Sequence, residues 1–108
     1  MTRTEFLTLL DAMSAEELAI FQAKNEDYAD RDGGNVLAQF DRLAGLLGVS
    51  PEMVLMIFLE KHLDATRAYC RHGTVASEPI TGRIQDARVY LALLRAMVER
   101  RESDDRDR

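Results

Sequence analysis

The feature that most constrains this sequence is one long stretch with a clear start and a clear stop, from Ser50 to Gly73. Ser50 is a capping serine, Pro51 follows at the first helical position, and Gly73 is a typical helix stop. The first half of the stretch is apolar on all sides, which predicts a helix at the centre of a bundle. The rest of the chain must therefore pack around this helix.

The N-terminal part of the chain shows helical periodicity and no strand-like alternation. A short helix is expected over residues 2–13. A second helix is expected to begin at Ser14, which forms a capping-box signature with Glu17, and to end near Ala29. The alternative is one long bent helix that passes through Ser14. We favour the break because the capping signature marks a helix start.

Two further helices are expected on either side of the central one. The first runs from Asn35, as its N-cap, to Leu47, and the second runs from about Glu78 to Arg100. Their expected buried faces are Val36, Phe40, Leu43 and Leu47 on the first, and Ile80, Ile84, Ala87, Leu91, Leu94 and Val98 on the second. The sequence thus predicts an all-α fold, a compact bundle of four to five helices. We expect a single helical domain over residues 1–100 and a disordered charged tail over residues 101–108.

Composition excludes several classes of function. The chain has 108 residues, 46% of them hydrophobic and 31% charged, as in one small globular domain. Its net charge of −5 argues against direct nucleic-acid binding, which needs a basic surface. Cys70 is the one cysteine and cannot form an intrachain disulfide. With no apolar signal region and no membrane span in the sequence, we expect a cytoplasmic protein with no membrane partner.

Carboxylates recur on both sides of Gly73. Glu60 and Asp64 are four residues apart and share one helix face, while Glu78 is followed eight residues later by Asp86. Two helices that carry carboxylates beside apolar stripes can build a divalent-cation site. The same spacing is typical of a solvated charged face, and spacing alone favours that alternative.

Other polar groups are open to two interpretations. Lys24, Asp27 and Tyr28 fall within one turn of each other and could hold a ligand, or they could be a lysine that favours the helix dipole beside two surface groups. His62 and His72 are ten residues apart, which is not a metal-ligand spacing on a helix. We therefore expect His62 to face a ligand or an interface rather than zinc.

These residues and several others stand in an order that is typical of a known protein family. The order consists of K-N-x-D-Y at 24–28, an asparagine at 35 and a phenylalanine at 40, an acid–lysine pair at 60–61, and E-x7-D-x3-Y at 78–90. It resembles the small, often phage-encoded, MazG-like proteins of the all-α nucleotide pyrophosphohydrolase superfamily. The resemblance implies a helical bundle that forms a homodimer or homotetramer. It also implies Mg²⁺ held by helix carboxylates, and pyrophosphate release by attack of water at the α-phosphate of a nucleoside triphosphate.

The resemblance gives the first hypothesis, a Mg²⁺-dependent nucleoside triphosphate pyrophosphohydrolase. Under it, Glu60, Asp64 and Asp86 are catalytic and, with Glu78, bind the metal ion. The residues expected to bind the nucleotide are Lys24, Asp27, Tyr28, Lys61, His62, Arg83 and Tyr90. Lys61 and Arg83 would neutralise phosphate, and Tyr90 would support Asp86 from one turn away.

Departures from the family pattern give a second hypothesis. The early E-x-x-E of the family is missing, the later E-x-x-D is shifted to Asp64, and Gly82 stands where related small proteins often carry an aspartate. A site with fewer metal-binding carboxylates and more cationic hydrogen-bond donors is better suited to binding a phosphate than to hydrolysing it. The alternative is therefore a non-catalytic oligomer that sequesters a nucleotide or nucleotide-derived signal, in an accessory role or in phage counter-defence. A structural interaction module is a third class. We expect weak or absent turnover with nucleotide binding retained.

Overall fold

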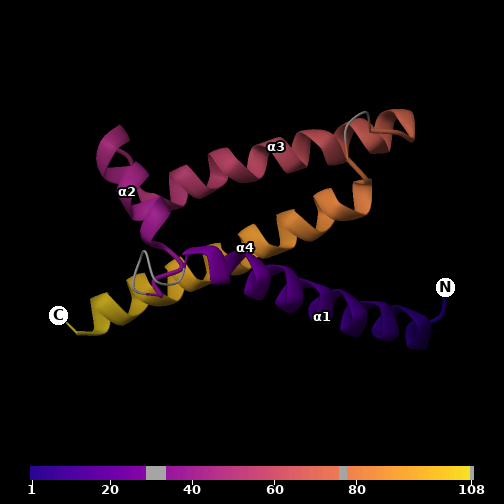
Figure 1. Ribbon diagram of the computed structural model, residues 1–108, viewed down its shortest axis with the longest axis horizontal. Helices are drawn as coiled ribbons and strands as arrows, with labels where there is room; N and C mark the ends of the chain where they lie inside the picture. The colour runs from indigo at the N-terminus through magenta and orange to yellow at the C-terminus, as the bar shows by residue number, and fades with distance from the viewer. Residues whose placement is uncertain (29–33, 76–77, 108) are drawn as a thin grey trace. The chain divides into compact units, whose positions relative to one another are not determined.

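The computed structural model describes residues 1–28, 34–75 and 78–107, and these ranges contain four helices and no strand (Figure 1). The helices are α1 (Arg3–Tyr28), α2 (Ala38–Leu47), α3 (Pro51–His72) and α4 (Ile80–Arg106). The all-α prediction is confirmed. Contacts within the chain divide it into two units, Met1–Val36 and Leu37–Arg108. The expected single domain over residues 1–100 stays a prediction.

The first unit contains one continuous helix, so the expected break at Ser14 is wrong. Ser14 Oγ donates to the Leu10 carbonyl at 3.0 Å, inside the helix, and does not cap a new one. The capping box lies at the N-terminus instead, where Glu5 N–H donates to Thr2 Oγ1 at 3.1 Å and Thr2 N–H donates to Glu5 Oε2 at 2.8 Å. No glycine or proline interrupts the chain at Ser14, and an established helix gains a hydrogen bond with each added residue.

The ends of α3 are the ones that the sequence predicts. Ser50 Oγ accepts a hydrogen bond from Met53 N–H at 3.2 Å, and Pro51 is the first helical residue. Gly73 ends the helix with φ of 77°, and Gly48 ends α2 in the same left-handed conformation with φ of 71°. Both glycines occupy a backbone region that costs other residues free energy.

The core of the second unit lies where α3 runs beside α4 and α2 packs on α3 (Figure 1). Leu55 is fully buried, and the Phe40 and Phe58 rings pack with centroids 5.7 Å apart. Burying a leucine side chain contributes about 1.5–3 kcal/mol. The core cluster consists of Leu37, Phe40, Ala44, Val54, Leu55 and Met97.

α2 begins later than expected, at Ala38 rather than after an Asn35 cap. Leu37 occupies the N-cap position, makes no side-chain capping bond and is buried in the core. Of the expected buried face, Phe40 is buried and Leu43 packs against the core, but Val36 and Leu47 are exposed. Leu37, and not Val36, is buried in the core.

α4 buries its expected face only in part. Leu94 packs against the core as expected, but Ile84, Leu91 and Val98 were expected in the core and are exposed. Met97 is buried instead, and Tyr90 and Leu93 pack against the core. Both stripes repeat at helical spacing, so periodicity alone does not decide which one faces α3.

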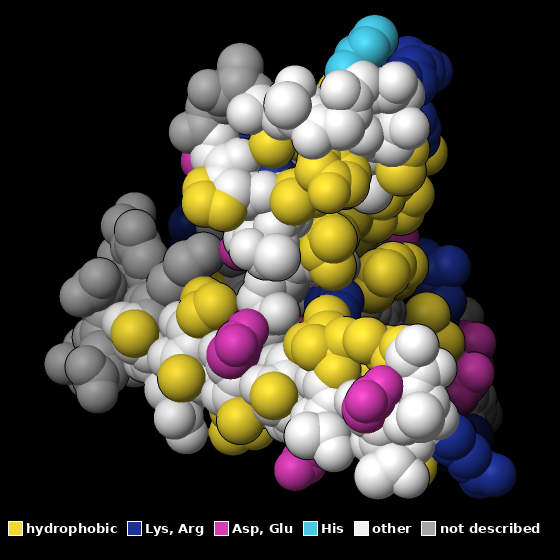
Figure 2. Space-filling view, turned by 90° about the vertical axis from the view of Figure 1, so that its right-hand side faces the viewer, with side chains coloured by type: hydrophobic (Ala, Val, Ile, Leu, Met, Phe, Trp, Pro, Cys, Tyr) yellow, Lys and Arg dark blue, Asp and Glu magenta, His cyan; other side chains and the backbone are white. Residues whose placement is uncertain are grey.

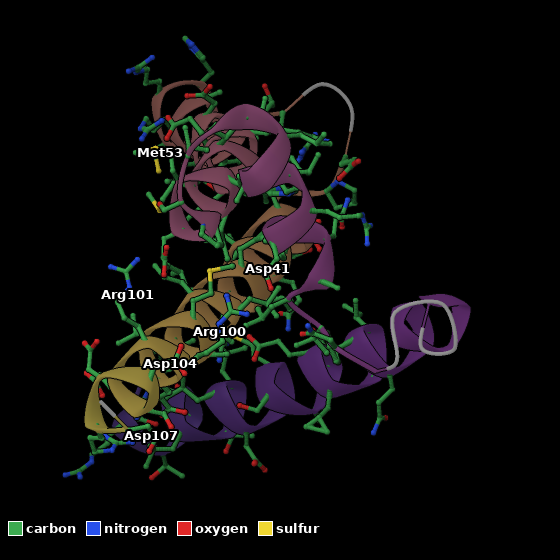
Figure 3. All side chains as sticks on the ribbon, turned by 90° about the vertical axis from the view of Figure 1, so that its left-hand side faces the viewer. Asp41, Met53, Arg100, Arg101, Asp104 and Asp107 are labelled. Atoms are coloured by element: carbon green, nitrogen blue, oxygen red, sulfur yellow. The ribbon has the colours of Figure 1, made fainter. Side chains whose placement is uncertain are left out.

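α4 continues to Arg106, through most of the segment for which a disordered tail was expected. Arg100 Nη1 and Nη2 each donate to one oxygen of Asp41 in α2, both at 2.9 Å. Arg101 Nη2 donates to Glu52 in α3 at 3.0 Å. The Arg100–Asp41 pair can be followed in Figure 3. A bidentate arginine–carboxylate pair has a fixed geometry, and these two pairs tie the end of α4 to α2 and α3.

Many large hydrophobic side chains lie at the surface of the chain (Figure 2). Among the described residues, no single helix is long and apolar enough to cross a membrane. α2 and α3 together meet the criteria of length and composition, but they are bent by 104° at the break between them.

Replacing Gly82 by alanine is expected to raise the free energy of unfolding by up to about 1 kcal/mol, because glycine is a poor residue inside a helix. A Cβ atom at Gly82 would meet nothing within 4 Å, so the substitution adds no clash. Urea denaturation of the full chain measures the change. Gly48→Ala is the matched control and should destabilise the protein, because its φ of 71° disfavours a Cβ atom. Equal effects at both positions would contradict the explanation.

Candidate functional site

The expected site residues on α3 and α4 fall into two groups. On the outer side of α3, Arg67 Nη1 donates to Glu60 Oε1 and to Asp64 Oδ1, both at 2.8 Å. All three side chains are exposed. Their close geometry makes an ion-pair network on a solvated face, of the kind that contributes little to stability.

The second group lies between α3 and the N-terminal half of α4, where His62 and Arg83 are both buried. Arg83 Nη1 lies 3.4 Å from His62 Nδ1, and His62 Nδ1 lies 3.9 Å from Asp86 Oδ2. Arg83 Nε lies 3.5 Å from the exposed carboxylate of Glu78. A histidine and an arginine from two helices therefore meet two carboxylates at one place, which we call the His62–Arg83 cluster (His62, Glu78, Arg83, Asp86 and Tyr90).

The surroundings of His62 lower its pKa below the ordinary value. Burial is the largest cause, because it disfavours the charged ring. Asp86 opposes this effect and raises the pKa, whereas the positive charges of Arg83 and Lys61 lower it further. The neutral ring leaves Nδ1 able to accept a hydrogen bond from Arg83, which a protonated ring cannot do. His62 is thus a neutral ring beside a buried cation.

Tyr90 forms the apolar wall of the His62–Arg83 cluster. Its ring packs against His62 with centroids 5.4 Å apart and against Phe58 at 6.4 Å. Burial, together with the charge of Asp86, raises the pKa of the Tyr90 phenol. Tyr90 is therefore a neutral ring that joins the cluster to the hydrophobic core.

The remaining expected residues lie outside both groups. Lys61 is exposed next to His62 on α3. The side chains of Lys24, Asp27 and Tyr28 lie outside the described part of the structure, so their expected role stays a prediction.

Two neighbours of the expected site residues were missed in the sequence. Arg67 could have been found, because it follows Glu60 by seven residues and Asp64 by three, which places all three on one helix face. Gln85 is a buried polar residue of α4. The sequence does not mark this burial. From hydrophobicity, the apolar Ile84 would be placed inside and the polar Gln85 outside, whereas the structure exposes Ile84 and buries Gln85.

The expected Mg²⁺ ligands are not gathered at one point of the described chain. Among the described residues, no three His, Cys, Asp or Glu side chains lie close enough together to hold a metal ion. Glu60 and Asp64 bind Arg67, and Glu78 lies beside Arg83. Mg²⁺ demands near-octahedral oxygen ligands and is usually held by one or two carboxylates together with substrate phosphates. Glu60, Asp64 and Glu78 each have an arginine partner in this arrangement, and the Mg²⁺ site stays a prediction.

Comparisons with known protein families, with curated proteins and with solved structures found no match to this chain. The geometry of the site therefore carries the functional argument. What it establishes is an all-α chain with a buried His–Arg cluster between two helices.

Proposed function

We propose that this protein binds a nucleotide through its phosphates at the His62–Arg83 cluster and holds it without hydrolysing it. The observation that carries the proposal is the 3.4 Å approach of a buried arginine and a buried histidine from two different helices. Arginine binds phosphate through several donors held in a fixed plane. Lys61 adds a second, exposed cationic group beside Arg83 and the neutral His62 ring.

The contact between Glu78 and Arg83 supports a phosphate site at the arginine. A Glu78 carboxylate oxygen lies 3.5 Å from Arg83 Nε, and the Glu78 side chain is exposed. This separation is long for a charge-assisted hydrogen bond, which is typically about 2.7–2.9 Å. We infer that a phosphate, with more charge and more acceptor oxygens, replaces Glu78 at the guanidinium group.

The arrangement of the acids supports binding without turnover. Glu60 and Asp64 are engaged by Arg67, and no described trio of acids is available for a metal ion. The pyrophosphohydrolase activity that the MazG-like resemblance implies stays a prediction. It requires carboxylates that are brought together by a ligand or by a second copy of the chain.

A panel of ribonucleoside and deoxyribonucleoside triphosphates tests the proposal by thermal shift and by calorimetric titration, in Mg²⁺ and in EDTA. We expect at least one nucleotide to bind in EDTA, and Arg83→Gln to weaken that binding at least tenfold, since charge-assisted bonds to phosphate contribute about 1.5–3 kcal/mol. Arg67→Gln is the matched control, because it removes the same charge from an exposed ion pair.

The outcomes of this panel separate the two hypotheses. Binding that Arg67→Gln weakens as much as Arg83→Gln does would place the nucleotide elsewhere. Pyrophosphate release in Mg²⁺ would establish the enzyme in place of the binder. Circular dichroism of each variant shows whether the helices persist.

A further inference from the structure

Tyr69 on α3 is an aromatic residue that the hydrophobic core does not use. Of the phenylalanine and tyrosine residues in the second unit, Phe40, Phe58 and Tyr90 pack against one another at its centre. Tyr69 is 41% exposed, and among the described residues its side chain makes no hydrogen bond and its ring contacts no other aromatic ring. Core packing therefore does not account for an aromatic side chain at this position.

Tyr69 shares a face of α3 with His62. The two residues are seven positions apart, which is nearly two full turns, so their side chains leave the helix in almost the same direction. Ala65 and Thr66 lie between them on that face, and both are small and half-buried. Along this face of α3, which is described throughout, no large or charged side chain separates Tyr69 from the His62–Arg83 cluster.

The spacing along α3 matches the length of a nucleotide. An α-helix rises about 1.5 Å per residue, so Tyr69 lies roughly 10 Å from His62 along the helix axis. In an extended nucleoside triphosphate, the base and the outer phosphates are separated by a comparable distance. Aromatic side chains on a helix also lean toward its N-terminus, which on α3 is the direction of His62. A nucleotide whose phosphates bind Arg83, 3.4 Å from His62, can therefore bring its base to the Tyr69 ring.

We propose that Tyr69 stacks on the base of the bound nucleotide and makes purine nucleotides the preferred ligands. This inference rests on the proposed function, because it places the base relative to phosphates held at the His62–Arg83 cluster. Bases of every kind stack on aromatic side chains through their flat faces, and a purine offers a larger face than a pyrimidine. Tyr69 thus selects a nucleotide over a polyphosphate of similar charge, which the cluster alone does not distinguish.

Calorimetric titration of the full chain in EDTA tests the inference with adenosine triphosphate, cytidine triphosphate and inorganic tripolyphosphate. Tripolyphosphate carries at least as much negative charge as the nucleotides, so charge alone does not favour a nucleotide over it. We expect adenosine triphosphate to bind at least about fivefold more tightly than tripolyphosphate, the lower end of what one stacked base contributes. Cytidine triphosphate should have an affinity between the two.

Two variants at Tyr69 separate stacking from other roles of the side chain. Tyr69→Leu should lower the affinity for adenosine triphosphate to that for tripolyphosphate and leave the latter unchanged, whereas Tyr69→Phe keeps the ring and should keep the preference. Ile57→Ala is the control and should change neither affinity, since Ile57 is 56% exposed on another side of α3. Stacking quenches the emission of 2-aminopurine riboside triphosphate, so the wild type and Tyr69→Phe should quench it and Tyr69→Leu should not.

Three outcomes would overturn the inference. Equal affinities of the wild type for adenosine triphosphate and tripolyphosphate would show that the base is not contacted, and would leave the phosphate site in place. Equal losses of nucleotide and tripolyphosphate binding in Tyr69→Leu would assign Tyr69 a structural role. Absence of binding by every one of these compounds would reject the proposed function together with this inference.

Discussion

Replacing Leu55 by alanine is expected to lower the free energy of unfolding by about 3.5 kcal/mol, the middle of the range for leucine truncation in a core. Leu55 is 0% exposed, lies on α3 and belongs to the core cluster together with Phe40 and Met97. The substitution removes apolar contacts and leaves a cavity that rigid helices fill only partly. Small domains have about 5–15 kcal/mol of stability in total, so the loss is a large fraction. Urea denaturation followed by circular dichroism measures it.

Leu91→Ala is the control for this prediction. It removes the same atoms from a side chain that is 51% exposed on α4. Its expected cost is below about 1 kcal/mol, the range of a surface substitution with a small loss of buried area. Equal losses at Leu55 and Leu91 would mean that the α4 stripe is covered in solution and that the core extends beyond the cluster described above.

The two ends of α3 could be predicted because local chemistry determines them. Ser50, Pro51 and Gly73 act through their own backbone and side-chain geometry, whatever the rest of the chain does. The same kind of signal failed at Ser14, because an S-x-x-E pattern inside a helix competes with the hydrogen bonds of the helix itself.

The buried side of α4 could not be predicted because two apolar stripes lie on the same helix. Leu91 and Met97 both follow helical spacing, and only contact with α2 and α3 decides that Met97 is buried. The end of α4 was missed for a similar reason. Arg100 and Asp41 are far apart in the sequence, and their bidentate pair appears only once α2 and α4 lie together.

The candidate site was predictable as a set of residues but not as an arrangement. His62, Arg83 and Asp86 were each expected to take part, and the fold brings them together. Glu60 and Asp64, which were expected to join Asp86, lie instead with Arg67. Spacing along one helix shows which residues share a face, but it does not show which face meets the neighbouring helix.

Acidification is expected to destabilise the protein through His62. Its pKa is lowered in the folded chain, first by burial and then by Arg83 and Lys61, although Asp86 opposes the change. The unfolded chain, in which histidine titrates near its usual pKa of about 6.5, therefore binds more protons than the folded chain below neutral pH. Stability falls as the pH drops through this value toward the lowered pKa of His62.

Nucleotide binding should raise the pKa of His62, so that the affinity rises as the pH falls below neutral. A phosphate beside Arg83 offsets the positive charges that lower the pKa of His62. The bound protein then holds more protons than the free one. By linkage, the affinity increases by up to about tenfold for each unit of pH between the free and bound pKa values. Calorimetric titration at several pH values measures the slope.

His62→Gln is the control that isolates this proton, because the nucleotide phosphates titrate in the same range in both proteins. We expect the variant to bind with a shallower dependence on pH than the wild type. Asp86→Asn adds a second test. Asp86 raises the pKa of His62, so its loss should move the onset of tighter binding to lower pH. Identical slopes for the wild type and His62→Gln would contradict the role of His62 but leave the nucleotide site in place. A complete absence of nucleotide binding would instead reject the proposed function itself.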